Sequence, residues 1–286
     1  MTADSPLPEA WLRALPDVGS LSPRVRRWYL GAAIASIVIL GGLWGFGDAL
    51  LTAAAPLLPH RMLNRLGDGM VRELGGDSCT APAGTAALTK LTARLTPARG
   101  FIEPVKVTVL NTAAVNALAA PGGRVVLFRG LIDKAHSPDE VAGVLAHEFT
   151  HVALRHPAQA LLRQMGLSLL VQAIGGDVGG FADLAAVLHG SRRAEAAADA
   201  GAITQLRASH ISPAGLAAFF VRIRDEDRAK PKDATRQVVD EVTSFAATHP
   251  GDTERAGLVA AAVARQGAVT PALDAADWQA LRAICE

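Results

Sequence analysis

Residues 147–151, which read His-Glu-Phe-Thr-His, restrict the possible folds of this chain because their spacing suits a helix that binds a metal ion. His147 and His151 are four residues apart, so on an α-helix both imidazoles lie on one face and can reach one ion. Glu148 follows the first histidine and can reach a water molecule held by that ion. Two imidazole ligands and a neighbouring carboxylate base are what a zinc hydrolase needs, so the motif predicts a catalytic Zn²⁺ site, one ion per chain.

The residues around the motif predict the limits of its helix. Ser137 is a favourable N-cap, and Glu140, three residues later, completes a capping box. Pro157 disfavours the helical conformation of the residue before it, so we expect the helix to end near His156. On such a helix His156 lies about 180° from His147, at about 100° per residue, and faces away from the metal. We therefore expect His156 to be structural, for example as a cap at the helix C-terminus.

A third metal ligand is predicted downstream, because catalytic zinc usually takes three protein ligands and one water. Glu195 and Asp199 are four residues apart in an alanine-rich stretch that favours a helix. Two carboxylates on one helix face repel each other unless a cation lies between them. Glu195 would be the ligand, and Asp199 would accept a hydrogen bond from the far nitrogen of a ligand histidine. The alternative is a solvated helix face.

Four segments resemble, in the same order, the signature elements of the M48 metallopeptidases, a gluzincin group with periplasmic bacterial members. They are residues 147–151 with Arg155 and His156; Ser191, Arg192, Glu195 and Asp199; residues 116–123; and residues 248–250 with Glu254 and Arg255. The resemblance covers roughly residues 85–265. Leu118, Ala120 and Thr248 depart from the family pattern, which puts the packing on the substrate side in doubt and leaves the metal chemistry intact.

The resemblance implies an α+β, mainly helical, zincin-type fold in which a small β-sheet flanks the metal-binding helix, with polypeptides as substrates. From the residues alone, 105–110 and 124–128 predict strands, and the Pro-Gly-Gly at 121–123 predicts a turn. By resemblance, an edge strand with Asn116, Ala117 and Leu118 would pair with an extended substrate peptide. A hairpin without any such role is the alternative.

The resemblance also assigns two residues near residue 250. His249 would approach the zinc, where it would either stabilise the oxyanion of the tetrahedral intermediate or occupy the open metal position in a resting form. Arg255 is a second cation close by in sequence, with either an oxyanion-stabilising or a structural role.

The N-terminal part of the chain predicts a membrane anchor. Residues 29–47 contain no charged side chain, and arginines precede them at positions 24, 26 and 27. That length suits one transmembrane helix, and the arginines predict a cytoplasmic N-terminus with the catalytic domain in the periplasm, on a bacterial inner membrane. A cleaved signal peptide is the alternative. The expected organisation is a cytoplasmic tail (1–27), an anchor (28–50), a connecting helical segment (51–84) and the metallopeptidase domain (85–286).

The two cysteines, Cys79 and Cys285, lie in no paired metal motif. In an oxidising compartment they would form one disulfide that ties the segment after the anchor to the end of the chain. Two unrelated thiols are the alternative.

Charge and composition limit the remaining possibilities. The net charge of +1 gives no indication of nucleic-acid binding, and the oligomeric state is left open. Further helices are expected to begin at Ser212 and Asp274. Residues 158–190 are ambiguous between a core or membrane-facing helix and a lid over the cleft, with Gly-Gly pairs as hinges.

Two other functional classes are open. The chain could be an envelope chaperone or scaffold in which proteolysis is secondary or absent, or a pseudo-enzyme that keeps only the fold. Intact Glu148 and three candidate ligands argue against a pseudo-enzyme.

Overall fold

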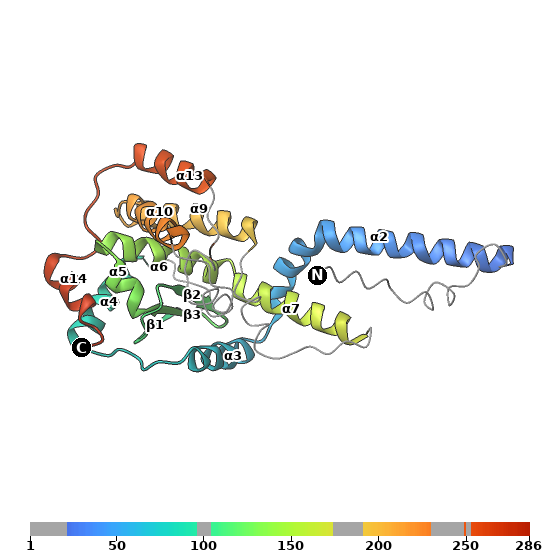
Figure 1. Ribbon diagram of the computed structural model, residues 1–286, viewed down its shortest axis with the longest axis horizontal. Helices are drawn as coiled ribbons and strands as arrows, with labels where there is room; N and C mark the ends of the chain where they lie inside the picture. Colours follow the sequence, from blue (N-terminus) through green and yellow to red (C-terminus); the bar gives the residue numbers. More distant parts are fainter. Residues whose placement is uncertain (1–21, 96–103, 174–190, 230–248, 250–252) are drawn as a thin grey trace, which may run out of the picture. The chain divides into compact units, whose positions relative to one another are not determined.

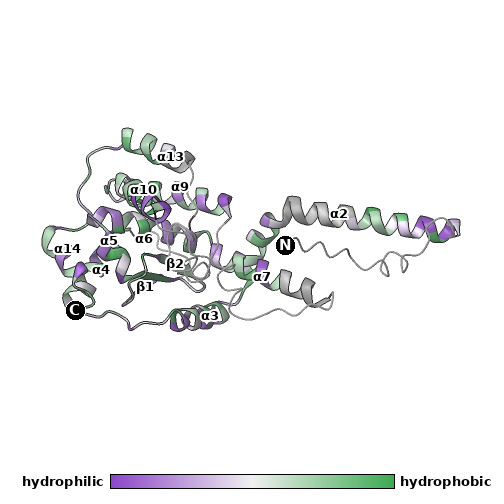
Figure 2. Cartoon of the chain, in the orientation of Figure 1, coloured by the Kyte–Doolittle hydropathy of each residue, from purple (hydrophilic) through white to green (hydrophobic). Residues whose placement is uncertain are grey.

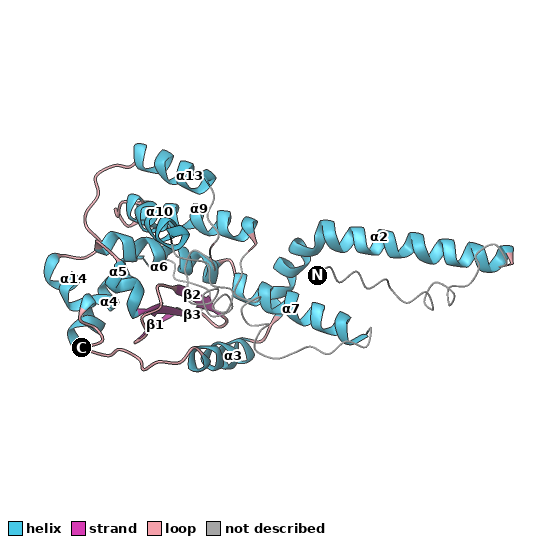
Figure 3. Cartoon of the chain, viewed as in Figure 1, coloured by secondary structure: helices cyan, strands magenta, loops and turns pink. Residues whose placement is uncertain are grey.

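The computed structural model describes residues 22–95, 104–173, 191–229, 249 and 253–286. Within these ranges helices dominate and three strands form one small sheet (Figure 3), which confirms the predicted mainly helical α+β class. The chain divides into two compact units, Met1–Leu51 and Thr52–Glu286.

The first unit contains most of helix α2 (Pro23–Ala54). Its first turns mix hydrophilic and hydrophobic residues, and the short coloured stretch that follows is mainly hydrophobic (Figure 2). Trp28, Leu30, Ile34 and Val38 are exposed on it. Among the described residues, however, none of the helices has the length and apolar character that a membrane span requires. The anchor predicted at 28–50 is therefore not confirmed.

Helix α6 (Pro138–Ala153) is the centre of the second unit (Figure 1). It is buried continuously from Glu140 to Val152, because α4 (Pro82–Leu95), α9 (Arg192–Ala208), α10 (Ala214–Ala229) and the sheet all pack against it. The hydroxyl of Ser137 accepts a hydrogen bond from the backbone N–H of Glu140, as the sequence predicts for an N-cap.

The sheet has the order β1-β3-β2, with β1 (Lys106–Leu110) parallel to β3 (Arg124–Phe128) and β2 (Ala117–Ala120) antiparallel to β3. The tight β2–β3 turn contains Gly122 and Gly123, both with positive φ, and a Cβ on Gly122 would lie only 2.5 Å from Oδ1 of Asn64. Since β2 pairs only with β3 among the described strands, it is an edge strand of this sheet.

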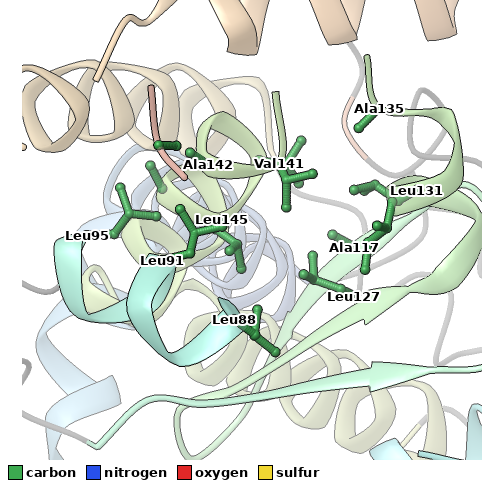
Figure 4. Packing of buried hydrophobic residues seen from close by; sticks show 14 of the residues in the cluster. Leu88, Leu91, Leu95, Ala117, Leu127, Leu131, Ala135, Val141, Ala142 and Leu145 are labelled. Carbon is green, nitrogen blue, oxygen red and sulfur yellow. The ribbon is translucent and has the colours of Figure 1, made fainter. Parts of the chain in front are cut away.

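Side chains alternate between the two faces of the sheet, as strand geometry requires. Val125 and Leu127 enter the main core, whereas Val126 and Phe128 join a second cluster with Met70 and Val71 of α3 (His60–Glu73). Figure 4 shows the main core, in which side chains of α4, α6 and the sheet meet: Leu88, Leu91, Leu95, Ala117, Leu127, Val141, Ala142 and Leu145.

The end of the chain returns to the second unit's N-terminal segment. Helix α14 (Ala275–Arg282) packs on α4, and Nζ of Lys90 lies 2.7 Å from a carboxylate oxygen of Asp277. The disulfide expected between Cys79 and Cys285 is present, with 206 residues of sequence separation. Helix α10 begins two residues after Ser212, and α14 one residue after its N-cap Asp274, close to the predicted starts.

Four further segments complete the described chain, among them α5 (Arg129–Lys134), which follows β3. The 3-10 helix η1 (Ala55–Leu57) follows α2, α7 (His156–Ala173) follows α6, and α13 (Thr253–Ala264) packs against α9 and α10.

Candidate metal centre

Helix α6 places the two motif histidines side by side in the interior. Nε2 of His147 lies 3.0 Å from Nε2 of His151, and both residues are buried. Each ring therefore presents the same nitrogen to the same point, as the four-residue spacing predicts. Phe220 of α10 packs edge-on against His147, with 5.7 Å between the ring centroids, which helps to fix that ring.

Helix α9 crosses α6 closely enough to bring Glu195 and Asp199 to these histidines. A Cβ on Gly201 would lie 2.3 Å from Cγ2 of Thr150 on α6, so only glycine permits this approach. The carboxylate oxygens of Glu195 lie 3.3 Å from Nε2 of His147 and 3.4 Å from Nε2 of His151.

Asp199 contacts the other nitrogen of the first histidine. Its Oδ1 lies 3.0 Å from Nδ1 of His147, and both side chains are buried. A carboxylate in this place keeps the proton of the imidazole on Nδ1, so that Nε2 presents a lone pair.

His249 joins the cluster from a distant part of the chain. Its Nδ1 lies 3.0 Å from Oε2 of Glu195 and 3.2 Å from Nε2 of His147. On its other side, Nε2 lies 3.3 Å from Oε1 of Glu148. The ligand-type atoms of His147, His151, Glu195 and His249 all lie within 4.8 Å of one another.

This donor set fits a zinc ion. Two ligands that each bind zinc at about 2.0–2.1 Å in tetrahedral geometry are about 3.3 Å apart. The distances among Nε2 of His147, Nε2 of His151 and the carboxylate of Glu195, at 3.0, 3.3 and 3.4 Å, are close to that value. Several nitrogens and a carboxylate that converge in a dry interior indicate a site for a cation.

Without a metal, burial and the neighbouring charges strongly shift the pKa values of the side chains in this cluster. Burial lowers the pKa of His147, but the hydrogen bonds to Asp199 and Glu195 outweigh it and raise that pKa to about 9. Burial opposes ionisation of Glu195, yet the charge of His249 and the hydrogen bonds of His147 and His249 hold its pKa far below its ordinary value. A proton on His147 thus takes the place that a cation would have between the two carboxylates.

Glu148 differs from Glu195 in its surroundings. It is completely buried, and burial raises its pKa, although the charges of His249 and His147 and the backbone N–H of Ala119 counter part of the shift. A carboxylate with a raised pKa is a stronger proton acceptor than an ordinary glutamate, which suits a general base.

His156 was predicted to be structural and to lie across one continuous helix from His147. It is not among the side chains that converge on the candidate metal position, as predicted, but it does not lie where that helix would have placed it. Helix α6 ends at Ala153, and Arg155 has a φ of 56°, so the chain turns sharply before a new helix begins. As a result, Nδ1 of His156 lies 2.9 Å from Nδ1 of His151. Pro157 does not stop a helix at this point but lies in the first turn of α7, a position that proline favours and the one signal that could have revealed the new helix.

The three residues predicted to bind substrate lie at the start of β2. Asn116 is fully buried, and its Oδ1 accepts a hydrogen bond from the backbone N–H of Ala117. Ala117 packs into the main core, and Leu118 joins the cluster on the face of the sheet that α3 covers. These side chains are therefore occupied by packing, and their contact with a substrate stays a prediction.

Two further predictions depend on parts that the structure does not describe. Arg255 belongs to α13, but its side chain is not described. The possible lid at 158–190 is described only as far as Ala173, the end of α7, so its glycine pairs lie beyond the described part.

A paired-histidine helix, a carboxylate from a second helix and a buried glutamate base define a metallopeptidase. The family model for peptidase family M48 matches residues 82–262. The chain belongs to peptidase family M48, as the resemblance of its motifs implies.

Curated relatives agree with this assignment. The chain is 28% identical over 197 residues to the beta-barrel assembly-enhancing protease of Escherichia coli (strain K12), over 62% of this chain and 40% of that protein. It is 29% identical over 212 residues to metalloprotease LoiP of the same organism, over 70% of this chain and 79% of that protein. It is also 27% identical over 154 residues to the mitochondrial metalloendopeptidase OMA1 of Schizosaccharomyces pombe, over 51% of this chain and 43% of that protein. The chain thus spans well under half the length of the first of these relatives.

Proposed function

We propose that this chain is a zinc-dependent endopeptidase that is anchored in a membrane by its N-terminal helix and cleaves proteins of the bacterial envelope. One observation carries the zinc assignment. Nε2 of His147, Nε2 of His151 and the carboxylate of Glu195 lie 3.0–3.4 Å apart, beside the buried carboxylate of Glu148. This is the two-nitrogen, one-oxygen donor set of a catalytic zinc site with one open position.

Each residue of the site has a separate role in the proposed reaction. His147, His151 and Glu195 would hold the zinc, which supplies Lewis acidity toward the attacking water and the scissile carbonyl. Glu148 removes the proton from the attacking water and later delivers it to the leaving amine. Asp199 holds His147 in the tautomer that presents Nε2. The edge of β2 that does not pair with β3 would align the substrate through main-chain hydrogen bonds, independently of its sequence.

The decisive experiment is the variant Glu148→Gln, which keeps the shape of the side chain and removes its basicity. We expect the variant to bind zinc at one ion per chain and to lose proteolytic activity by at least 100-fold, in line with the contribution of a general base. Casein is a suitable substrate, and chelation of the metal should abolish the activity of the unchanged protein. Cleavage at the wild-type rate by zinc-loaded Glu148→Gln would rule out this mechanism.

His249 has two candidate roles that a single variant separates. Its Nδ1 is 3.0 Å from Glu195 and 3.2 Å from His147, which supports occupation of the open metal position in a resting form. Its Nε2 is 3.3 Å from Glu148, which also suits a group that meets the oxyanion. In His249→Ala, release of a resting block would raise the rate of casein cleavage, whereas loss of an oxyanion donor would lower it. If neither rate nor zinc affinity changes, His249 has no function here.

The proposed location and substrates rest on the sequence and on the names of relatives. The uncharged stretch 29–47 and the arginines before it favour a single span with a cytoplasmic N-terminus. The Cys79–Cys285 disulfide suits an oxidising compartment such as the periplasm. A relative named as a beta-barrel assembly-enhancing protease makes envelope proteins, including misfolded ones, the substrates to try first. Fractionation that recovers the intact chain in the soluble fraction would contradict the anchor.

An envelope chaperone or scaffold with secondary or absent proteolysis is the second candidate, favoured by the name of the same relative. It predicts that the Glu148→Gln protein protects an envelope protein from aggregation as well as the unchanged protein does. The endopeptidase proposal predicts instead that cells producing Glu148→Gln accumulate uncleaved substrate bound to it.

A further inference from the structure

His156 is the residue whose position departs most from the sequence-based expectation. Its Nδ1 lies 2.9 Å from Nδ1 of His151, on the side of that ring opposite the metal-facing Nε2. The ring centroids are 4.9 Å apart with an interplanar angle of 71°, so the contact is edge-on between two nitrogens and is not a stacked one. The geometry suits one hydrogen bond between two imidazoles.

The direction of this hydrogen bond follows from the metal site. If Nε2 of His151 binds the metal, its only proton is on Nδ1, which then donates to the lone pair on Nδ1 of His156. Metal-binding histidines usually donate their second N–H to a carboxylate, a carbonyl or water, and this contact fixes both the tautomer and the ring orientation. His147 has Asp199 for this purpose, at 3.0 Å.

His156 is itself held in place by the fold. Arg155 adopts a left-handed conformation, which changes the direction of the chain. His156 then begins α7. Ala158, two residues later, is buried against Ala55 and Leu63 in a small separate core. The amide Nε2 of Gln159 donates a hydrogen bond of 2.8 Å to the carbonyl of Leu154, which joins the first turn of α7 to the end of α6.

We propose that His156 is a positioning residue for the metal ligand His151, and that the docked first turn of α7 sets the orientation of that ligand. The two motif histidines thus have unequal supports, a carboxylate for His147 and a neutral imidazole for His151. Because α7 packs on η1, His156 also connects the segment directly after α2 to the metal centre. This inference rests on the proposed zinc site.

The test compares two substitutions at one position. In His156→Asn, an amide atom takes the place of Nδ1 and can still accept the hydrogen bond, whereas His156→Leu has a similar bulk and no acceptor. Zinc affinity is measured by chelator competition on the full chain, and the unfolding midpoint is measured on the metal-free protein. His136→Leu, at an exposed histidine that precedes α6, is the matched control.

We expect His156→Leu to bind zinc 10–100-fold more weakly than the unchanged protein, the usual effect of removing such a support. His156→Asn should stay within about threefold, the control should be unchanged, and the metal-free unfolding midpoints should agree. Wild-type affinity in His156→Leu would overturn the inference while leaving the zinc site intact. Equal losses in both variants, or a loss that parallels a lower metal-free midpoint, would make His156 a packing residue only. Failure of the unchanged protein to bind zinc would instead remove the proposed function and this inference with it.

Discussion

Oδ1 of Asp199 lies 3.0 Å from Nδ1 of His147, and both side chains are inaccessible to solvent. This pair joins α9 to α6 on the side of His147 that faces away from the other ligands. The same contact that orients the imidazole therefore also fixes the crossing of the two helices that build the site.

Asp199→Asn should weaken zinc binding by 10–100-fold. The amide keeps the shape of the carboxylate, but it lacks the negative charge that holds the proton on Nδ1 of His147. Chelator competition measures the effect. Asp225→Asn, at an exposed aspartate on α10, is the control and should bind zinc normally. An unchanged affinity in Asp199→Asn would mean that the carboxylate does not support the ligand.

After metal removal, the folded state should become less stable as the pH rises. In the metal-free protein the pKa of His147 is raised to about 9, where burial opposes the charge and the hydrogen bonds to Asp199 and Glu195 favour it. Because the pKa of His147 is higher in the folded state than in the unfolded state, its protonation stabilises the fold. This stabilisation is fully present below the unfolded pKa of about 6.5 and is lost as the pH rises through 9.

The loss between pH 6.5 and 9 should be on the order of 3 kcal/mol, from about 1.4 kcal/mol for each pKa unit. Urea unfolding of chelator-treated protein at several pH values measures it. The zinc-loaded protein is the control and should show a smaller loss over this range, since zinc bound at Nε2 keeps His147 neutral. A metal-free protein that becomes more stable toward pH 9 would contradict the charge assignment.

Gly201→Ala should reduce both stability and zinc affinity. The added Cβ would lie 2.3 Å from Cγ2 of Thr150, so α9 must move away from α6 and take Glu195 and Asp199 with it. Overpacking of this kind costs about 1–3 kcal/mol. Gly69→Ala is the control, because its Cβ would meet nothing nearer than 3.9 Å and alanine favours a helix. Equal stability of the two variants would show that the helices tolerate a wider crossing.

Replacing both Cys79 and Cys285 by serine should lower the free energy of unfolding without affecting zinc binding. The disulfide closes a loop of 206 residues, for which the chain-entropy model gives at most about 5 kcal/mol. Reductant should lower the unfolding midpoint of the unchanged protein to that of the double variant and leave the double variant unaffected. A reductant effect of equal size on both proteins would assign the stabilisation elsewhere.

Much of the local structure follows from the sequence because it depends on neighbours within one turn or one strand. The four-residue spacing of His147 and His151 places both rings on one face of a helix, and Ser137 begins that helix. The strand at 124–128 was likewise predictable from its β-branched residues. The separation of Glu195 from Asp199 predicts one shared face on the second helix, and both residues lie at the cluster.

Only the tertiary structure decides which distant groups meet. His156 reaches His151 because one left-handed residue, Arg155, redirects the chain, and no periodicity in the sequence encodes that turn. His249 joins the cluster across 102 residues of sequence, at a contact that depends on the packing of whole helices. The spacing of residues sets the faces of each helix, since backbone geometry repeats locally. The metal centre forms only where two such faces meet, and that depends on how closely α6 and α9 cross. Gly201 permits the close crossing.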